Sequence, residues 1–318
     1  SRLSARDQNG FSITRFETVF SMDNRAVQAK NLHLETTLSS VEADLQVQYA
    51  SLQSLQDSIL SALFTLELQH LHISNSDILY FSPQLISQPF FSSVDNTTSL
   101  SGNLSGSLND LTVTALQIET GEDTRLQTEF SITGLPEMDS ARISLPYLRF
   151  ASGKSDIGML AGSLIPGRIE LPGQLSLQIS FDGMLNDFKT SAVLNSSFGD
   201  AQLAASLGAD EAFSSSMTVD DFNLGRLLGD TLMFGHVTLT AEARGRGLNI
   251  NSLTADEAGS GPDQNTLSMD MKAEIPYIYL NSYAYHGLQI DGTWSDKAFN
   301  GIIDMEDEYL AFGFEGLV

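Results

Sequence analysis

The sequence contains no cysteine, which excludes disulfide bonds, thiol catalysis and cysteine-ligated metal sites. It has one tryptophan, and only 16 Lys and Arg against 40 Asp and Glu, a formal net charge of −24. Such a chain repels phosphate backbones, and it has no concentrated basic patch, so no nucleic-acid partner is expected. The densest basic stretch is only Arg244-Gly245-Arg246.

Long apolar runs are also missing. No stretch of about 18 apolar residues could span a bilayer as a helix, and no signal peptide opens the chain. The chain starts at Ser1-Arg2 and stops at Val318 inside a strand-like pattern. We therefore expect a piece of a longer protein, whose membrane anchor would lie outside it.

What the sequence does contain is a period of two. Hydrophobic and polar residues alternate clearly in residues 124–133, 173–183, 236–244 and 309–315. This pattern predicts β-strands with one dry and one wet face. Turn signals such as Asn109-Asp110 follow at intervals of about 8–14 residues, which favours an antiparallel meander of about twenty strands.

Helical signals are few. Residues 152–164 and 221–228 have plausible helix starts and stops, and residues 51–62 fit a short helix or a broken strand pair. A six-residue pattern, Gly-x-Leu-Asn-Asp-apolar, occurs at 106–111 and again at 183–188, with a weaker copy at 245–249. Each copy is interpreted as a hairpin that turns at Asn-Asp.

About twenty strands with one apolar face need shelter for that face. A sandwich or barrel would provide it, whereas a sheet curled along its length would shelter the face only partly. Many Ala, Thr and Ser on the dry faces favour an interior that protein does not fill. The predicted fold class is therefore all-β and mainly antiparallel: a long curled sheet with an open groove and a few short helices. Residues 1–318 would form one continuous sheet, with sub-boundaries near 82–98 and 152–172.

Several motifs carry a resemblance to a known family. They are residues 10–13 (GFSI), 31–36 (NLHLET), 100–111 (LSGNLSGSLNDL), 287–294 (GLQIDGTW) and 299–304 (FNGIID). In this order, along nearly the whole chain, they resemble the TamB (translocation and assembly module) family of Gram-negative bacteria, related more distantly to AsmA-type proteins. The family usually continues with Asn after the last motif, where this chain has Met305-Glu306-Asp307-Glu308.

The resemblance implies a β-taco, a curled sheet with a hydrophobic inner groove, in a non-enzymatic protein. Such proteins bridge the periplasm from an inner-membrane anchor, and they are linked to phospholipid transport and to outer-membrane protein assembly. The implied partners are phospholipid acyl chains and an outer-membrane β-barrel assembly partner. No cofactor, metal or catalytic residue is expected.

The groove lining is expected on the dry faces of the alternating strands. The predicted lining residues are Leu126, Phe130, Ile132, Leu175, Leu177, Ile179, Phe181, Val237, Leu239, Leu310, Phe312 and Phe314.

Candidates for chemistry are weak by comparison. His70 and His72 share a strand face, a spacing found in metal sites, but no third ligand is identifiable. The acidic residues 304–308 lack the central glycine of a calcium loop and are interpreted as a solvated turn. No motif selects a catalytic pair among the 40 carboxylates.

Two alternative functions remain open. An extracellular adhesin or surface module would share the acidity and the lack of cysteine, and it predicts a closed, fully packed core. A polysaccharide-active β-solenoid predicts regular parallel coils, which the Asn-Asp hairpins disfavour.

Overall fold

The computed structural model describes residues 2–7, 11–51, 53, 62–161, 165–166, 169–248, 267–295 and 298–317. The chain forms two compact units, unit 1 (Ser1–Pro166) and unit 2 (Gly167–Val318). The structure is 67% strand and 11% helix, and its antiparallel pairing does not close into a barrel. The predicted all-β fold with few short helices is confirmed. The two units divide within the 152–172 stretch, whereas residues 82–98 lie inside unit 1.

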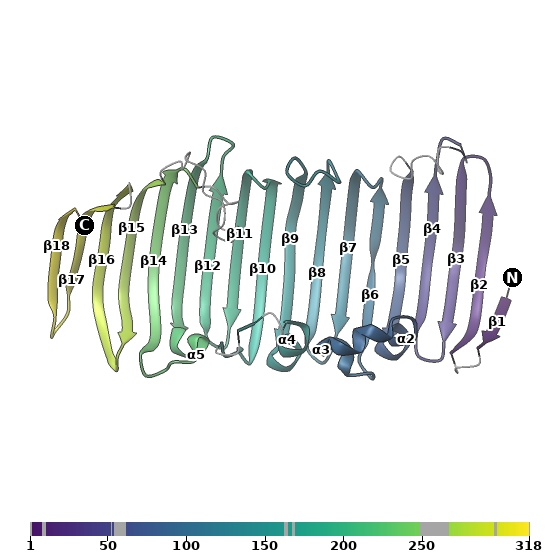
Figure 1. The fold of residues 1–318 in the computed structure, drawn as a ribbon, viewed down its shortest axis with the longest axis horizontal. Helices are drawn as coiled ribbons and strands as arrows, with labels where there is room; N and C mark the ends of the chain where they lie inside the picture. Colours follow the sequence, from purple (N-terminus) through teal and green to yellow (C-terminus); the bar gives the residue numbers. More distant parts are fainter. Residues whose placement is uncertain are drawn as a thin grey trace. The chain divides into compact units, whose positions relative to one another are not determined.

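In unit 1 the described residues form nine strands, and each pairs antiparallel with the next (Figure 1). The strands are β1 (Arg2–Arg6), β2 (Ser12–Met22), β3 (Ala26–Thr36), β4 (Ser40–Gln48), β5 (Leu63–Ser74), β6 (Thr97–Gly106), β7 (Asp110–Thr120), β8 (Thr124–Thr133) and β9 (Arg142–Gly153). The stretch predicted at 124–133 coincides with β8.

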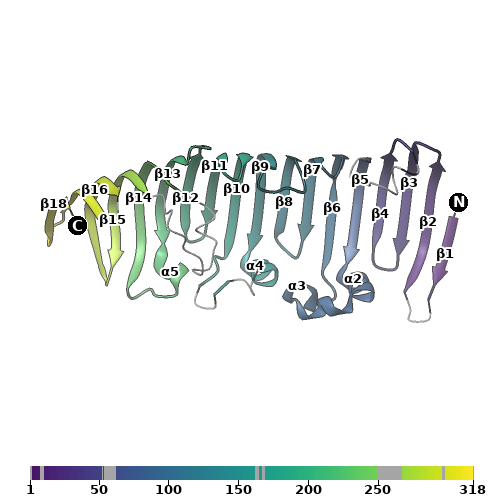
Figure 2. The same cartoon turned by 45° about the horizontal axis from the view of Figure 1, so that its top comes forward.

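Short helices follow β5 and β9. They are α2 (Asn75–Phe81), the 3-10 helix η2 (Pro83–Ser87), α3 (Pro89–Ser92) and α4 (Lys154–Ala161). All four lie at one end of the strands of unit 1 (Figure 2). The helix predicted at 152–164 is confirmed as α4, whereas the helices between residues 75 and 92 were not predicted. The helix expected at 51–62 falls largely outside the described residues.

Unit 2 repeats the arrangement with nine further strands in the described residues, again paired antiparallel in chain order. They are β10 (Gln174–Met184), β11 (Asp187–Ser196), β12 (Gly199–Leu207), β13 (Ala212–Asn223), β14 (Phe234–Arg246), β15 (Ser268–Leu280), β16 (Tyr283–Ser295), β17 (Ala298–Glu306) and β18 (Ala311–Leu317). The helix predicted at 221–228 is shorter, α5 (Leu224–Leu228), because Asn223 caps it by accepting a hydrogen bond from the Arg226 N–H.

The two predicted copies of the hairpin motif have the same geometry. Gly106 and Gly183 have φ angles of +119° and +137°, which side chains rarely adopt. A Cβ at either position would collide with the backbone carbonyl of the Asp four residues later, Asp110 or Asp187. Glycine is therefore required where each strand enters its turn.

Candidate functional site

The cross-strand pairing of unit 1 places apolar side chains in continuous rows on one face. Directly opposed residues in antiparallel strands point to the same side of a sheet. Leu126 of β8 belongs to a row that runs from β2 to β9 without a polar member. The row consists of Phe16, Leu34, Val41, Leu71, Leu100, Ile118, Leu126 and Phe150.

Phe130 and Ile132 lie on the same face in two further rows. The Phe130 row is Phe20, Ala29, Leu45, Leu66, Leu104, Val113 and Phe130. The Ile132 row is Met22, Val27, Val47, Phe64, Gly106, Leu111, Ile132 and Ile143. The predicted lining residues of unit 1 thus mark an apolar face that crosses eight strands.

Thr128 is a polar exception on this face. It lies on β8 between Leu126 and Phe130 and is buried. Its hydroxyl donates a hydrogen bond of 2.8 Å to the Tyr147 carbonyl oxygen, so it adds no unsatisfied donor to the apolar surface.

Unit 2 has its own apolar face. The row through Ile179 crosses all nine described strands of the unit, from β10 to β18. Its members are Ile179, Ala192, Leu203, Met217, Ala241, Ala273, Ile290, Ile303 and Phe314. The next row contains Leu177, Leu194, Ala201, Val219 and Leu239.

The remaining predicted residues of unit 2 fit this face with one exception. Leu175 and Phe181 occupy every second position of β10 together with Leu177 and Ile179, so all four share one face. Phe312 pairs with the buried Met305. Val237 pairs with Ile278 and is itself buried. Leu310 precedes β18 and lies in the turn, where its carbonyl oxygen accepts a hydrogen bond from the Asp307 N–H. The alternation predicted over residues 309–315 began two residues too early, because β18 starts at Ala311.

These apolar faces are open rather than packed. Most of the predicted lining residues are half-buried, Phe312 is 48% exposed, and Leu203 in the Ile179 row is 41% exposed. In the described residues, fully buried apolar side chains are few: Ala43, Tyr49, Ala62, Val113, Ala141, Ile157, Phe198, Leu207, Val237, Phe299 and Met305. No second layer of described residues covers either face.

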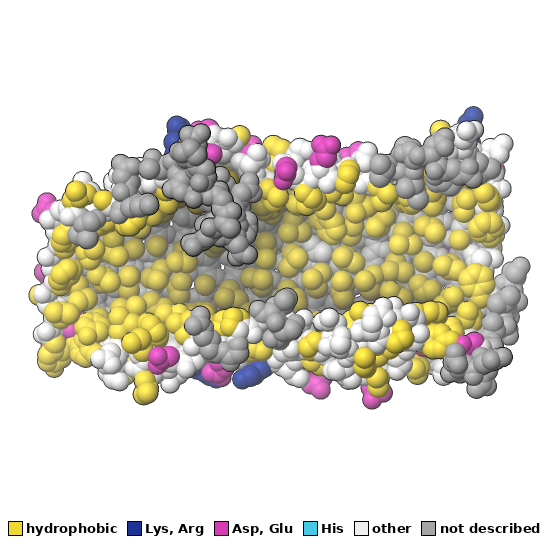
Figure 3. All heavy atoms as spheres, viewed as in Figure 1, with side chains coloured by type: hydrophobic (Ala, Val, Ile, Leu, Met, Phe, Trp, Pro, Cys, Tyr) yellow, Lys and Arg dark blue, Asp and Glu magenta, His cyan; other side chains and the backbone are white. Residues whose placement is uncertain are grey.

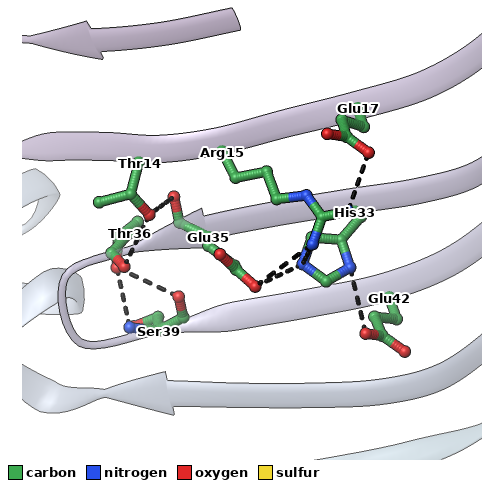
Figure 4. Close-up of polar contacts among 8 residues, drawn as sticks. All are labelled: Thr14, Arg15, Glu17, His33, Glu35, Thr36, Ser39 and Glu42. Carbon is green, nitrogen blue, oxygen red and sulfur yellow. Dashed lines mark hydrogen bonds and ion pairs between the residues drawn. The ribbon is translucent and has the colours of Figure 1, made fainter. Parts of the chain in front are cut away.

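The opposite face of the strands is polar in each unit. On unit 2 it carries opposed charges across neighbouring strands, such as Asp182 with Lys189 and Arg244 with Asp270. On unit 1 the imidazole of His33 lies 2.6 Å from the Glu35 carboxylate and 3.1 Å from that of Glu42 (Figure 4). Arg15 joins this cluster through a 2.9 Å ion pair with Glu17. The strands of each unit are therefore apolar on one side and hydrated on the other.

Bulges bend the sheet of unit 1. One extra residue lies near the middle of each of four strands, β3, β5, β7 and β9. At this residue the register shifts against both neighbouring strands for β3, β5 and β7, and against β8 for β9. Asn31 in β3 and Ala115 in β7 adopt positive φ angles at these points. A bulge bends its strand and increases the local twist, so four bulges near mid-strand crease the sheet.

The space-filling view shows the result. Over the strands of unit 1, hydrophobic side chains form a hollowed floor between raised borders at the two strand ends (Figure 3). Over the strands of unit 2, hydrophobic side chains also gather on the visible face, and Asp and Glu appear near its borders. Each unit thus has an apolar trough of its own.

The candidates for metal or catalytic chemistry gain no support. His70 and His72 lie on one face as predicted, with ring centroids 6.4 Å apart and an interplanar angle of 5°. In the described part of the chain, no group of three or more His, Asp or Glu side chains could hold a metal ion. Of the helices that the structure describes, none has the length and hydrophobicity needed to cross a bilayer.

The acidic residues 304–308 do more than face solvent. The side chain of Asp307 is only 2% exposed, and it accepts hydrogen bonds from the Tyr283 hydroxyl and from the backbone N–H groups of His286 and Tyr309. The Tyr283 hydrogen bond is the main reason that the pKa of Asp307 falls to about 2, and the same bond raises the pKa of Tyr283 to about 12. This turn is a hydrogen-bonded anchor, which the sequence analysis missed.

A second buried carboxylate anchors a turn in unit 1. Asp156 of α4 is 1% exposed and accepts hydrogen bonds from the Asp123 and Thr124 N–H groups and from the Thr124 hydroxyl. Burial alone would raise its pKa, but these hydrogen bonds outweigh burial and the pKa lies below its ordinary value. α4 is thereby fixed to the β7–β8 turn.

No protein-family model, no curated protein and no solved structure matches the chain.

Proposed function

We propose that the chain is part of a non-enzymatic protein of the Gram-negative envelope whose apolar sheet faces carry phospholipid acyl chains. In this proposal it belongs to a periplasmic bridge that is anchored in the inner membrane and serves phospholipid transport, outer-membrane protein assembly, or both. The main support is the Ile179 row, which is apolar in all nine of its strands and has no described layer over it.

The physical need for such a face is large. An acyl chain of about 16 carbons loses roughly 13 kcal/mol of favourable transfer free energy when it enters water, at about 0.8 kcal/mol per CH₂. A continuous apolar row keeps the chain out of water along its path. Because successive positions in a row offer similar side chains, sliding changes the buried area little and the barriers stay low. The headgroup would stay in water at the border.

The polar faces support the same proposal. Opposed charges such as Asp182 and Lys189 hydrate the outer side of the sheet, so one side meets water while the other holds hydrocarbon. The alternative, an adhesin or surface module, requires a closed core. Leu203 and Phe312 on the apolar face are too exposed to belong to a closed core.

The sequence neighbours Leu203 and Gln202 offer a matched test. Both lie on β12, but Leu203 belongs to the apolar Ile179 row and Gln202 pairs with Thr218 on the polar face. Leu203→Asp should lower the amount of co-purified phospholipid that the chain retains, measured by native mass spectrometry without detergent. Gln202→Asp adds the same charge on the other side and should leave lipid retention unchanged.

Circular dichroism melting of both variants separates a lost ligand from a lost fold. In the full-length protein, Leu177→Asp with Leu239→Asp should stop lipid transport while the protein still folds. Wild-type protein that carries no phospholipid, or a folded Leu203→Asp variant that retains it fully, would overturn the proposal.

A further inference from the structure

Tyrosine is concentrated in one part of unit 2. Five of the eight tyrosines of the chain lie between residues 277 and 309, at one end of β15 and β16 and in the β17–β18 turn. Figure 1 shows that the β15–β16 and β17–β18 turns lie at the same end of their strands. A cluster of this kind places several aromatic faces close to one border of the apolar trough.

Cross-strand pairing shows on which side of the sheet the Tyr283 and Tyr285 rings lie. Tyr285 pairs with Ile278, which pairs with the buried Val237, and Tyr283 pairs with Leu280. The rings of Tyr283 and Tyr285 therefore continue the apolar face to the end of its strands. Tyr309, which is 76% exposed, adds a third ring from the turn.

The three rings stand at steep angles to one another. The centroids of Tyr283 and Tyr285 are 4.8 Å apart with an interplanar angle of 71°, and those of Tyr283 and Tyr309 are 5.8 Å apart at 83°. Both pairs are edge-to-face contacts, and the exposed Tyr309 leaves aromatic surface open to solvent beside the other two rings. The Tyr283 ring is fixed by its hydroxyl, which donates a hydrogen bond to the buried Asp307 carboxylate.

The charge around this corner is negative. The described residues 277–295 and 298–317 contain six Asp and Glu and no Lys or Arg. The Asp307 carboxylate accepts a hydrogen bond from the Tyr283 hydroxyl, and Glu308 directly precedes Tyr309 in the turn. The imidazole of His286 also contacts this carboxylate, with its Nδ1 3.1 Å from an Asp307 oxygen. Aromatic faces with carboxylates behind them attract organic cations.

We propose that Tyr283, Tyr285 and Tyr309 form an aromatic corner that binds an alkylammonium group, such as the head group of a zwitterionic phospholipid. The inference rests on the proposed function only in making the ligand a lipid, whose acyl chains would lie on the adjoining apolar face. An anionic head group without an ammonium would meet only repulsion from Asp307 and Glu308.

A soluble probe tests the corner without any lipid. Choline and its neutral isostere 3,3-dimethylbutan-1-ol have the same shape, so only the charge differs between them. Ligand-observed NMR titration of the chain should show choline bound at least about threefold more tightly than the isostere, with ring-current shifts of its methyl protons. Equal affinity for the two compounds would overturn the proposal.

Variants of Tyr309 sharpen the test, because this ring is exposed and its replacement does not disturb a core. Tyr309→Leu should weaken choline binding about threefold, whereas Tyr309→Phe keeps the aromatic face and should bind nearly as well as the wild type. Tyr147→Leu on β9 of unit 1 is the control and should change nothing. Unchanged binding by Tyr309→Leu would also refute the corner.

A lipid measurement then separates the two proposals. Native mass spectrometry with phosphatidylethanolamine and phosphatidylglycerol of equal chain length should show a preference for the former that Tyr309→Leu reduces about threefold. Lipid retention without head-group preference and without choline binding refutes the corner and leaves the proposed function standing. Choline binding without any lipid retention supports the corner and refutes the proposed function.

Discussion

Unit 1 and the first four strands of unit 2 reach the same two-faced sheet by different routes. In unit 1, alternate strands carry a mid-strand bulge, so the apolar residues Val113 and Leu116 of β7 share a face although they are three positions apart. In unit 2, the pairings from β10 to β13 have unbroken register. The first bulge comes near the end of β13, where it pairs with β14. A bulge changes the spacing of apolar residues in the sequence but keeps them on one face.

Curvature is specified differently in the two regions. Regular alternation, as in Leu175 to Phe181 of β10, fixes the face of every side chain and leaves the bend to the normal twist of the sheet. A bulge such as that at Ala115 adds a local bend at the cost of an unfavourable backbone conformation. Unit 1 therefore has a crease that its sequence encodes residue by residue.

The largest effect is expected where the two units are alike. Gly106→Ala in unit 1 and Gly183→Ala in unit 2 each force a side chain into a positive-φ conformation and against a backbone carbonyl. Each should lower the free energy of unfolding by about 3 kcal/mol. Denaturant unfolding followed by circular dichroism measures this loss.

The control is Gly173→Ala, whose Cβ would meet nothing closer than the Ser197 hydroxyl at 3.6 Å. It should stay within about 0.5 kcal/mol of the wild type. Loss of stability in only one of the two hairpin variants would show that the two copies of the motif are not equivalent.

A smaller effect is expected from the carboxylates that anchor turns, Asp156 in unit 1 and Asp307 in unit 2. Both have folded-state pKa values below that of the unfolded chain, and that of Asp307 falls to about 2 because Tyr283 donates a hydrogen bond to it. A depressed pKa stabilises the fold above the unfolded value of about 3.9, and this stabilisation is lost as the pH falls toward 2.

Asp156→Asn should therefore cost about 2 kcal/mol at pH 7 and flatten the decline of stability below about pH 4. Asp307→Asn should flatten the decline in the same pH range for unit 2. Hydrogen exchange measured by mass spectrometry assigns each loss to its unit. Asp304→Asn, on the exposed polar face, is the control, and a wild-type pH profile in the other two variants would contradict the anchoring role.

Much of the fold could be predicted from alternation, and the exceptions have physical causes. The period of two gave β8 its correct bounds and placed Leu126, Phe130 and Ile132 on one face. It could not show which residues of β7 face the trough, because the extra residue at Ala115 breaks the alternation between Val113 and Leu116. Which strands bulge depends on pairing with neighbours, which no single strand's sequence contains.

The helices between residues 75 and 92 were missed for a different reason. Pro83 and Pro89 divide the segment into pieces too short for a helical period to be detected. A signal was present in the Ser74 cap and the Asp77 that follows it in the first turn of α2. The aromatic corner could not be predicted, because Tyr283 and Tyr309 come together only through the pairing of β15 to β18.

The smallest effect should distinguish the creased sheet from the regular one by its sign. Ala115 in β7 and Ala204 in β12 are both exposed strand alanines, but Ala115 lies at a bulge with φ of +52° and Ala204 pairs in regular register. Ala115→Gly should stabilise unit 1 by about 1 kcal/mol, because glycine adopts the left-handed conformation without the Cβ penalty. Ala204→Gly should destabilise unit 2 by about 0.5–1 kcal/mol, because glycine loses more backbone entropy in an extended strand. Thermal and denaturant melts of the two variants measure both changes, and effects of the same sign would mean that the bulge at Ala115 does not hold its strained backbone in solution.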